Sequence, residues 1–174
     1  EAVSQSAAHI KSALQAQAEV TYAGTMDERF LEAAVAKLAG DFDQRSAGFG
    51  AAPKFPPTMV LDFLMRMGGA QANAMVAATL QAMARGGIND QLAGGFARYS
   101  VDADWVVPHF EKMLYDNAQL LGLYGRAARV YDHPAYAEVA RQTADFMIAE
   151  LGTPEGAFAS ALDADSEGAE GTYY

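Results

Sequence analysis

The chain has 174 residues, of which 51% are hydrophobic, and it carries a formal net charge of −10 at pH 7. This length suits one domain with a single substantial core, and no apolar run reaches the roughly 20 residues that a membrane-spanning helix needs. The acidic balance, without any cluster of Lys or Arg, excludes a nucleic-acid-binding surface, because phosphate contacts require a basic face. The sequence has no cysteine, which excludes disulfides, thiolate metal sites and a cysteine nucleophile. We expect no cofactor and no metal ion, and a neutral polar or cationic ligand suits the chain best.

Apolar residues recur at helical spacing through most of the chain, so we expect a nearly all-α protein. The expected helices span about 2–20, 26–42, 58–67, 70–85, 108–131 and 134–151. Gly68-Gly69 and Gly86-Gly87 mark the ends of the third and fourth helices. Pro108 and Pro134 suit the first turns of the fifth and sixth. These helices form three antiparallel pairs.

Long Gly-rich stretches follow the second, fourth and sixth helices. The first, FDQRSAGFGAAPKFPP from Phe42, cannot be helical, and residues 88–107 are expected to be weakly extended, with Gly94-Gly95 in a hairpin turn. The helix pairs differ in sequence, and they show no internal repeat beyond this alternation of helix pair and loop. Because all three loops follow alternate helices, we expect them to gather at one end of a helical array, where function usually resides.

The ends of the sequence indicate a fragment of a longer protein. The chain does not begin with Met, and Tyr173-Tyr174 resembles the middle of an element. No signal-peptide pattern opens the sequence, and we assign a cytoplasmic location as an expectation. An open array of about three hairpins would expose helix faces, so we also expect the fragment to self-associate and to show no turnover alone.

The stretch WVVPHFEKMLYDN, from Trp105 to Asn117, holds the richest set of polar side chains. On a helix that begins near Pro108, His109 would lie in the first turn, on one face with Asp116. The positive end of the helix dipole would keep the imidazole neutral and able to accept a proton or a sugar hydroxyl hydrogen bond. The alternative is a hydrogen-bonded packing role for His109, with Glu111 complementing the dipole.

Two loops offer further ligand-binding groups. Glycines beside aromatic residues in AGFGAAPKFPP let a backbone approach a ligand, and Lys54 could reach into a cleft; a rigid loop with a solvated Lys54 is the alternative. Residues 86–105 place Arg98, Tyr99 and Trp105 beside Asn and Asp side chains, a mixture that suits carbohydrate. An ordinary network of Arg98 with neighbouring aspartates would use the same residues.

The acidic stretch DADSEGAEG, which begins at Asp163, partly matches the calcium-loop template. The template places a bidentate Glu at its twelfth position, where this chain has Tyr174, so calcium is not expected. Asp163 and Asp165 project the same way in an extended segment, and such a carboxylate pair suits acid/base chemistry. A solvated acidic loop remains the alternative.

Three blocks, GFGAAPKFP, GGINDQLAGGFARYSVDADWVVPHFEKMLYDNAQL and DADSEGAEGTYY, resemble in order and separation one family. It is the thioredoxin-domain-containing family typified by spermatogenesis-associated protein 20, and the resemblance covers about residues 25–174. It implies an N-terminal thioredoxin-like domain, absent from this chain, followed by an (α/α)6 toroid of helical hairpins. That toroid is similar to those of N-acylglucosamine 2-epimerases, cellobiose epimerases and six-hairpin glycosidases. Residues 1–174 would form a single domain that supplies about three hairpins.

The residues and the resemblance together give the expected site. The candidate catalytic residues are His109, Asp163, Asp165 and Glu111. The candidate substrate-binding residues are Lys54, Arg98, Tyr99, Trp105, Asp116, Asn117 and Glu167. The leading hypothesis is a carbohydrate-active or carbohydrate-binding toroid, with sugar-epimerase-like or glycosidase-like chemistry. The alternative is a non-catalytic interaction module that presents client proteins to the attached thioredoxin domain.

Overall fold

The computed structural model describes residues 2–18 and 27–172. Tyr173 and Tyr174 therefore lie outside the described residues. The chain divides into two compact units, Glu1–Leu31 and Glu32–Tyr174. The first unit contains helix α1 (Ala2–Ala18), and the second contains the candidate site.

Helices form the body of the second unit. They are α2 (Glu28–Asp41, which begins in the first unit), α3 (Thr58–Met67), α4 (Gly69–Arg85), α5 (Leu114–Val130) and α6 (Pro134–Phe146), with a π-helical turn at Met147–Leu151. The expected ends at Gly68 and Gly86, and the expected start at Pro134, are confirmed. The helical expectation for the chain is therefore confirmed in most of its elements.

The predicted start of the fifth helix at Pro108 is wrong. Residues Pro108–His109 form strand β2, Lys112–Met113 form strand β3, and α5 begins only at Leu114. The backbone of this segment pairs with other loops: the Arg98 N–H donates to the Glu111 carbonyl at 2.8 Å, and the Leu114 N–H donates to the Ser160 carbonyl at 2.9 Å. Pairing with distant loops has overridden the local helical pattern.

Short antiparallel ladders join the loops to one another. Strand β1 (Tyr99–Ser100) pairs with β2, with Tyr99 opposite His109. Strand β3 pairs with β4 (Ala161–Leu162), with Lys112 opposite Leu162. Strand β5 (Asp165–Ser166) pairs with β6 (Ala169–Glu170), so that the acidic stretch forms a β-hairpin.

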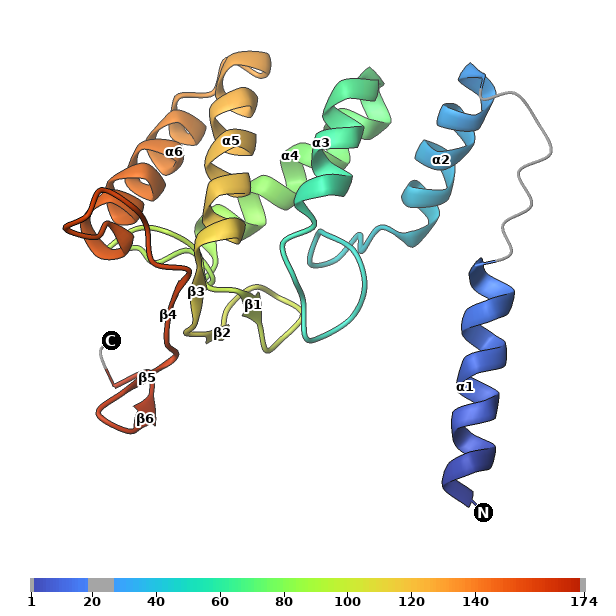
Figure 1. The fold of residues 1–174 in the computed structure, drawn as a ribbon. Coiled ribbons are helices and arrows are strands. Elements are labelled where there is room, and N and C mark those ends of the chain that lie inside the picture. The colour runs from blue at the N-terminus through green and yellow to red at the C-terminus, as the bar shows by residue number, and fades with distance from the viewer. Residues whose placement is uncertain (1, 19–26, 173–174) are drawn as a thin grey trace. The chain divides into compact units, whose positions relative to one another are not determined.

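The core lies between the helices. Their apolar faces bury Leu61, Leu64, Val76, Leu80, Met83, Leu120, Tyr124 and Ala127, and Phe146, Met147 and Leu151 form a smaller cluster beside them. Figure 1 shows α3 to α6 side by side, with the long loops and the short strands at one end of the array. The expectation that the loops gather at one end is confirmed. Among the described residues, no helix combines the length and apolar character needed to cross a bilayer.

Candidate functional site

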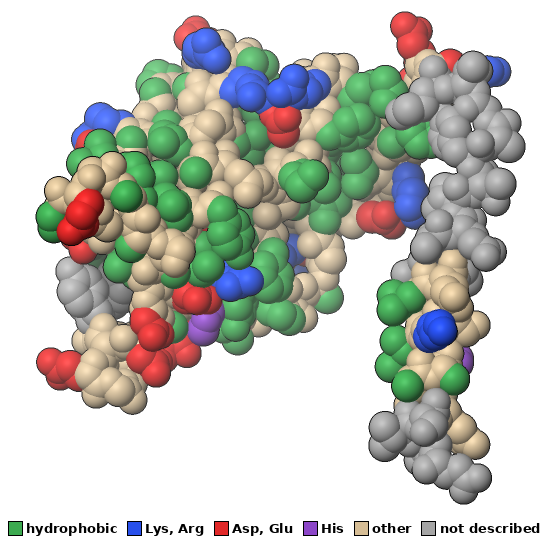
Figure 2. Space-filling view, in the orientation of Figure 1, with side chains coloured by type: hydrophobic (Ala, Val, Ile, Leu, Met, Phe, Trp, Pro, Cys, Tyr) green, Lys and Arg blue, Asp and Glu red, His purple; other side chains and the backbone are tan. Residues whose placement is uncertain are grey.

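A pocket of about 290 Å³ opens between the second and third long loops. Aromatic rings of Phe110 and Phe146 form part of its wall. Three carboxylates, from Glu150, Asp163 and Asp165, face it together with Ser166 and Lys112. The structure therefore brings the two predicted aspartates together with groups from α6 and β3. Figure 2 shows Asp and Glu side chains beside a His at the end of the molecule that carries the β5–β6 hairpin.

Lys112 contributes little free positive charge to this pocket. Its Nζ lies 2.6 Å from Asp90 Oδ2, donates to the Gly94 carbonyl at 3.0 Å, and stands 4.4 Å from the centre of the Phe146 ring. Burial lowers the pKa of Lys112, while the ion pair with Asp90 opposes that shift. Because Asp90 already balances the ammonium group, the three other carboxylates leave the pocket negatively charged.

His109 lies on the other side of the strand segment from Phe110 and Lys112, because side chains alternate along an extended chain. Its Nδ1 is 2.8 Å from Glu170 Oε1, and its Nε2 is 3.7 Å from Glu111 Oε2. The imidazole stacks on the Tyr99 ring, with centroids 4.6 Å apart. The predicted helix-dipole effect on His109 is wrong, since His109 belongs to β2 and not to the first turn of α5.

The His109 cluster also contains the predicted residues Arg98 and Asp116. The Arg98 guanidinium is 3.4 Å from Glu111 Oε2 and lies over the Tyr115 ring at 6.0 Å. Burial raises the pKa of Asp116, and the nearby positive charge of Arg98 partly offsets this effect. Among the described residues, the buried Asp116 Oδ2 atom has no hydrogen-bond partner. This oxygen is thus a buried acceptor without a protein donor.

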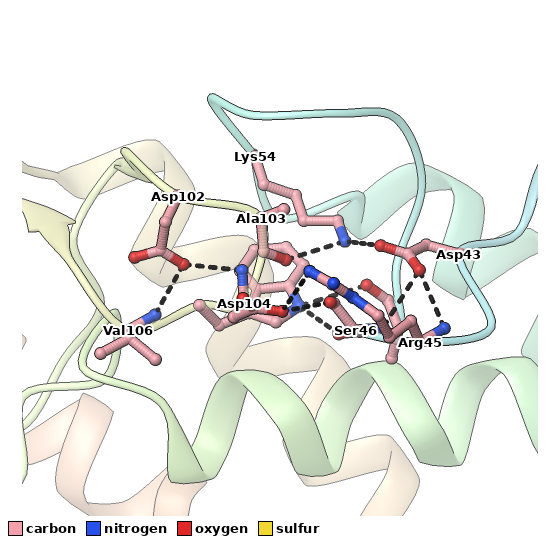
Figure 3. A network of polar contacts seen from close by, with 10 residues as sticks. Asp43, Arg45, Ser46, Lys54, Asp102, Ala103, Asp104 and Val106 are labelled. Atoms are coloured by element: carbon pink, nitrogen blue, oxygen red, sulfur yellow. Dashed lines mark hydrogen bonds and ion pairs between the residues drawn. The ribbon is translucent and has the colours of Figure 1, made fainter.

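The structure does not bring Lys54 and Trp105 to either of these clusters. Both side chains are buried, and Figure 3 shows Lys54 in a network of polar contacts with Asp43 and Ala103. Lys54 Nζ donates to Asp43 Oδ2 at 2.6 Å and to the Ala103 carbonyl at 3.0 Å, and it holds the pKa of Asp43 down at about 2. The Trp105 indole N–H donates to the Ser46 carbonyl at 3.0 Å. These contacts join the first long loop to the second.

Asn117 and Glu167 also lie outside the pocket. Asn117 is fully buried, where it donates to the carbonyls of Phe96 and Met113 at 3.0 and 2.9 Å and accepts the Phe96 N–H at 2.7 Å. Glu167 occupies the exposed turn of the β5–β6 hairpin, with φ of 54°. Asn117 therefore links α5 to the second loop, and Glu167 shapes a turn.

The expected site omitted several residues that the structure places in it. Glu170, from the hairpin, approaches His109 and also accepts the Phe110 N–H at 3.1 Å. Phe110, Phe146 and Glu150 line the pocket without having been singled out. The alternation of PHFEKM could have indicated an extended segment with two faces, one bearing His109 and Glu111 and the other Phe110 and Lys112.

Relatives with curated descriptions match nearly the whole chain. It is 37% identical to spermatogenesis-associated protein 20 of Mus musculus and 36% identical to the Homo sapiens protein, over 95% of its own length in both cases. It spans 23% of the length of each relative. No protein-family model matches the chain.

Solved structures of similar fold include two sugar epimerases. A sugar epimerase from a ruminal bacterium matches with a TM-score of 0.62 and 12% identity, over 74% of this chain and 37% of that protein. Cellobiose 2-epimerase from Bacillus thermoamylovorans matches with a TM-score of 0.62 and 11% identity, over 79% of this chain and 42% of that protein. At this identity the likeness establishes the α/α-toroid fold alone. Over the residues that it spans, the chain is a homologue of the spermatogenesis-associated protein 20 sequences.

Proposed function

We propose that this region is a carbohydrate-binding toroid domain and that the pocket between the second and third loops holds one sugar unit. The observation that carries the proposal is the composition of the pocket. Carboxylates from Glu150, Asp163 and Asp165 can accept hydrogen bonds from sugar hydroxyls, and the rings of Phe110 and Phe146 offer apolar faces for C–H groups. A volume of about 290 Å³ lies at the small end of ligand pockets, which suits a single ring.

The His109 cluster supports epimerase-like proton transfer beside this pocket. Phe110 and Gly171 line the pocket, and their chain neighbours His109 and Glu170 contact each other. A carboxylate at Nδ1 fixes one imidazole proton, which leaves Nε2 as a base. In a 2-epimerisation, this base would take the proton from C2 of an open-chain sugar unit that extends from the pocket to the face of the strand bearing His109. The C–H electrons would form a C=C bond, and the carbonyl π electrons would move to the oxygen to give an enolate. A second acid then returns a proton to the opposite face.

Isothermal titration of the 174-residue chain with glucose, mannose and cellobiose tests the binding proposal. We expect saturable binding of at least one sugar, weakened about tenfold or more when Asp163→Asn and Asp165→Asn are combined, because each lost charge-assisted hydrogen bond contributes about 1.5 kcal/mol or more. The matched control is Asp102→Asn with Asp104→Asn, at the other DAD sequence of the chain. Absence of binding to every sugar would refute the proposal.

The catalytic part is tested separately by proton exchange. In D₂O, the epimerase-like base should introduce deuterium at C2 of a sugar bound to the longer protein that contains this chain, and NMR would detect the loss of that proton signal. We expect His109→Gln to abolish the exchange while binding persists. His133→Gln is the control, since His133 lies at the turn before α6 and contacts Tyr136 instead. Exchange that survives in His109→Gln would remove the proposed role of the imidazole.

A second candidate function, protein binding, is favoured by an exposed apolar loop tip. Val101, Val106 and Val107 have exposed fractions of 52%, 61% and 51%. The Asp102 carboxylate accepts the backbone N–H groups of Val106 and Val107, which holds this tip in place. We propose as the alternative that the tip binds client proteins for a thioredoxin-like domain of the longer protein. It predicts that Val106→Asp in a full-length relative lowers the yield of client mixed disulfides, whereas Asp163→Asn does not.

A further inference from the structure

The first and second long loops begin with the same hairpin. One reads FDQRSAGF from Phe42, and the other reads NDQLAGGF from Asn89. The Asp43 N–H donates to the Gly48 carbonyl at 2.9 Å, and the Asp90 N–H donates to the Gly95 carbonyl at 2.9 Å. In each hairpin, Oδ1 of the aspartate also accepts the N–H groups two and three residues further on. The loops therefore contain an internal repeat, which the differing helices conceal.

The repeat extends to a buried lysine that follows each hairpin. Lys54 Nζ lies 2.6 Å from Asp43 Oδ2, and Lys112 Nζ lies 2.6 Å from Asp90 Oδ2. Each lysine belongs to an extended segment that pairs antiparallel with the next long loop, at Ser100 and at Leu162. The same Asp–Lys pair thus closes each loop on itself, and the segment that carries the lysine pairs with the next loop.

The paired segments of those successor loops are alike as well. They read VDADW from Val101 and LDADS from Leu162, and in both the first aspartate accepts the N–H of the second, at 2.6 Å for Asp102 and 3.1 Å for Asp163. We call the unit built around Asp43, Lys54 and VDADW the first copy of the repeat, and the unit built around Asp90, Lys112 and LDADS the second copy. When the two copies are aligned, Trp105 of the first corresponds to Ser166 of the second. Trp105 is fully buried, whereas Ser166 lines the pocket.

The aromatic contacts of Trp105 are supplied from another element in the second copy. A Cβ added to Gly48 would lie 2.7 Å from the Trp105 ring, and one added to Gly95 would lie 2.4 Å from the Phe146 ring. The lysines stand over the same two rings, Lys54 over Trp105 and Lys112 over Phe146. Because α6 provides Phe146, the residue at position 166 has no packing role and can be small. The pocket occupies the space beside it.

Asp165 of the second copy lacks the side-chain contacts that Asp104 makes in the first copy. Asp104 accepts the Ser46 hydroxyl and contacts the Arg45 guanidinium at 3.4 Å. The corresponding positions in the second copy are Leu92 and Ala93, whose side chains cannot donate. Among the described residues, no side chain hydrogen-bonds to Asp165 or to Glu150. The second copy therefore presents Asp165 without a side-chain partner to a pocket with aromatic walls, beside Glu150, whose charge interacts with the Lys112 ammonium group.

We propose that this pocket binds the ring of an amino sugar, with the protonated amine held by Glu150, Asp163 and Asp165. This inference rests on the proposed function and specifies its substrate class. A neutral sugar would leave a negatively charged pocket uncompensated, whereas an ammonium group adds charge-assisted hydrogen bonds to the hydroxyl contacts. The ring would lie against the aromatic wall, next to the position that a Trp fills in the first copy.

Calorimetric titration of the chain at pH 6.5 with glucosamine, N-acetylglucosamine and glucose tests the inference. We expect glucosamine to bind at least tenfold more tightly than the two uncharged sugars. Asp165→Asn should remove most of this preference, because it deletes one carboxylate that the fold does not use. Ser166→Trp should abolish the binding of all three sugars by filling the pocket. The control Asp104→Asn, at the matching position of the first copy, should leave the preference unchanged.

The outcomes separate this inference from the proposed function. Equal affinity for glucosamine and glucose would overturn the preference for an amine and leave carbohydrate binding intact. Binding of no sugar would overturn the proposed function itself. A preference that survives both Asp165→Asn and Ser166→Trp would place the binding elsewhere and overturn the assignment of the pocket. Cyclohexylamine binding as tightly as glucosamine would show that the hydroxyl groups are not recognised, which also contradicts the proposal.

Discussion

At the scale of single residues, buried charges decide how the loops are held. Lys54 has a fully buried side chain whose ammonium group depends on Asp43, and its neighbour Trp105 covers it from the second loop. Lys112 and Asp90 repeat this arrangement. Removal of one partner from such a pair leaves an uncompensated buried charge, which costs far more than an exposed ion pair contributes.

Asp43→Asn should therefore destabilise the chain by about 3 kcal/mol at pH 7. The pKa of Asp43 in the folded chain is about 2, below its usual value of 3.8, so the pair contributes its stability above pH 4 and loses it as the pH falls towards 2. The difference in free energy of unfolding between the parent chain and Asp43→Asn should narrow as the pH falls from 4 towards 2. Urea unfolding at pH 7 and pH 3 measures it, with Asp41→Asn as the exposed control. If the difference in free energy of unfolding is the same at pH 7 and pH 3, the stabilising role of the Lys54–Asp43 ion pair is contradicted.

The contribution of Asp116 to folding stability should depend on pH in the opposite direction. Burial raises its pKa, so the folded state favours the protonated carboxyl, and its contribution to stability is fully present below pH 4 and lost as the pH rises through the folded pKa. We expect Asp116→Asn to be more stable than the parent chain at pH 7, with the gain disappearing at pH 4. Paired urea titrations at the two pH values measure the effect, and a gain independent of pH would refute it.

At the scale of elements, the β5–β6 hairpin depends on Glu170. This side chain accepts the Phe110 N–H at 3.1 Å and approaches the His109 imidazole at 2.8 Å. Glu170→Gln weakens the second contact, and we expect amide hydrogen exchange in residues 163–172 to accelerate about fivefold, corresponding to about 1 kcal/mol. Glu167→Gln, in the exposed turn of the same hairpin, serves as the control and should leave exchange unchanged. Equal acceleration in both variants would exclude the proposed anchoring.

The helices could be predicted from the sequence, whereas the strands and the site largely could not. Gly68, Gly86 and Pro134 act locally, so their helix boundaries follow from short-range rules. The segment from Pro108 to Met113 becomes extended because its backbone pairs with β1 and β4, which come from other loops. That error moved His109 onto the wrong element. Asp163 and Asp165 do line the pocket, but Phe146 and Glu150 reach it only through the docking of α6.

At the scale of the whole molecule, the arrangement of the loops explains where a site can form. Each of the first two long loops is closed by an Asp–Lys pair, and successive long loops are joined by β-pairing at one end of the helices (Figure 1). The first copy fills its interior with Trp105, and the second leaves a pocket. The same sequence pattern thus places a buried packing residue, Trp105, in the first copy and a residue of the candidate binding pocket, Ser166, in the second.

Self-association of the chain stays a prediction at this scale. Val130, Ile148 and Phe158 are exposed to 55%, 68% and 48% on the last helix pair and the loop after it. Such apolar surface tends to find a partner. Sedimentation velocity should show concentration-dependent dimers or larger species, which a double variant Val130→Lys and Ile148→Lys reduces. A strictly monomeric parent chain would contradict the expectation.

The central claim is that the pocket between the second and third loops holds a carbohydrate. Amide chemical shifts of the labelled chain, recorded while a sugar is added, test it most directly. We predict saturable shifts at Phe110, Glu150 and Ser166, and none in the separate groove between α3 and α5 that Thr58, Gln119 and Arg126 line. Shifts confined to that groove, or no shift at saturating sugar, would contradict the claim.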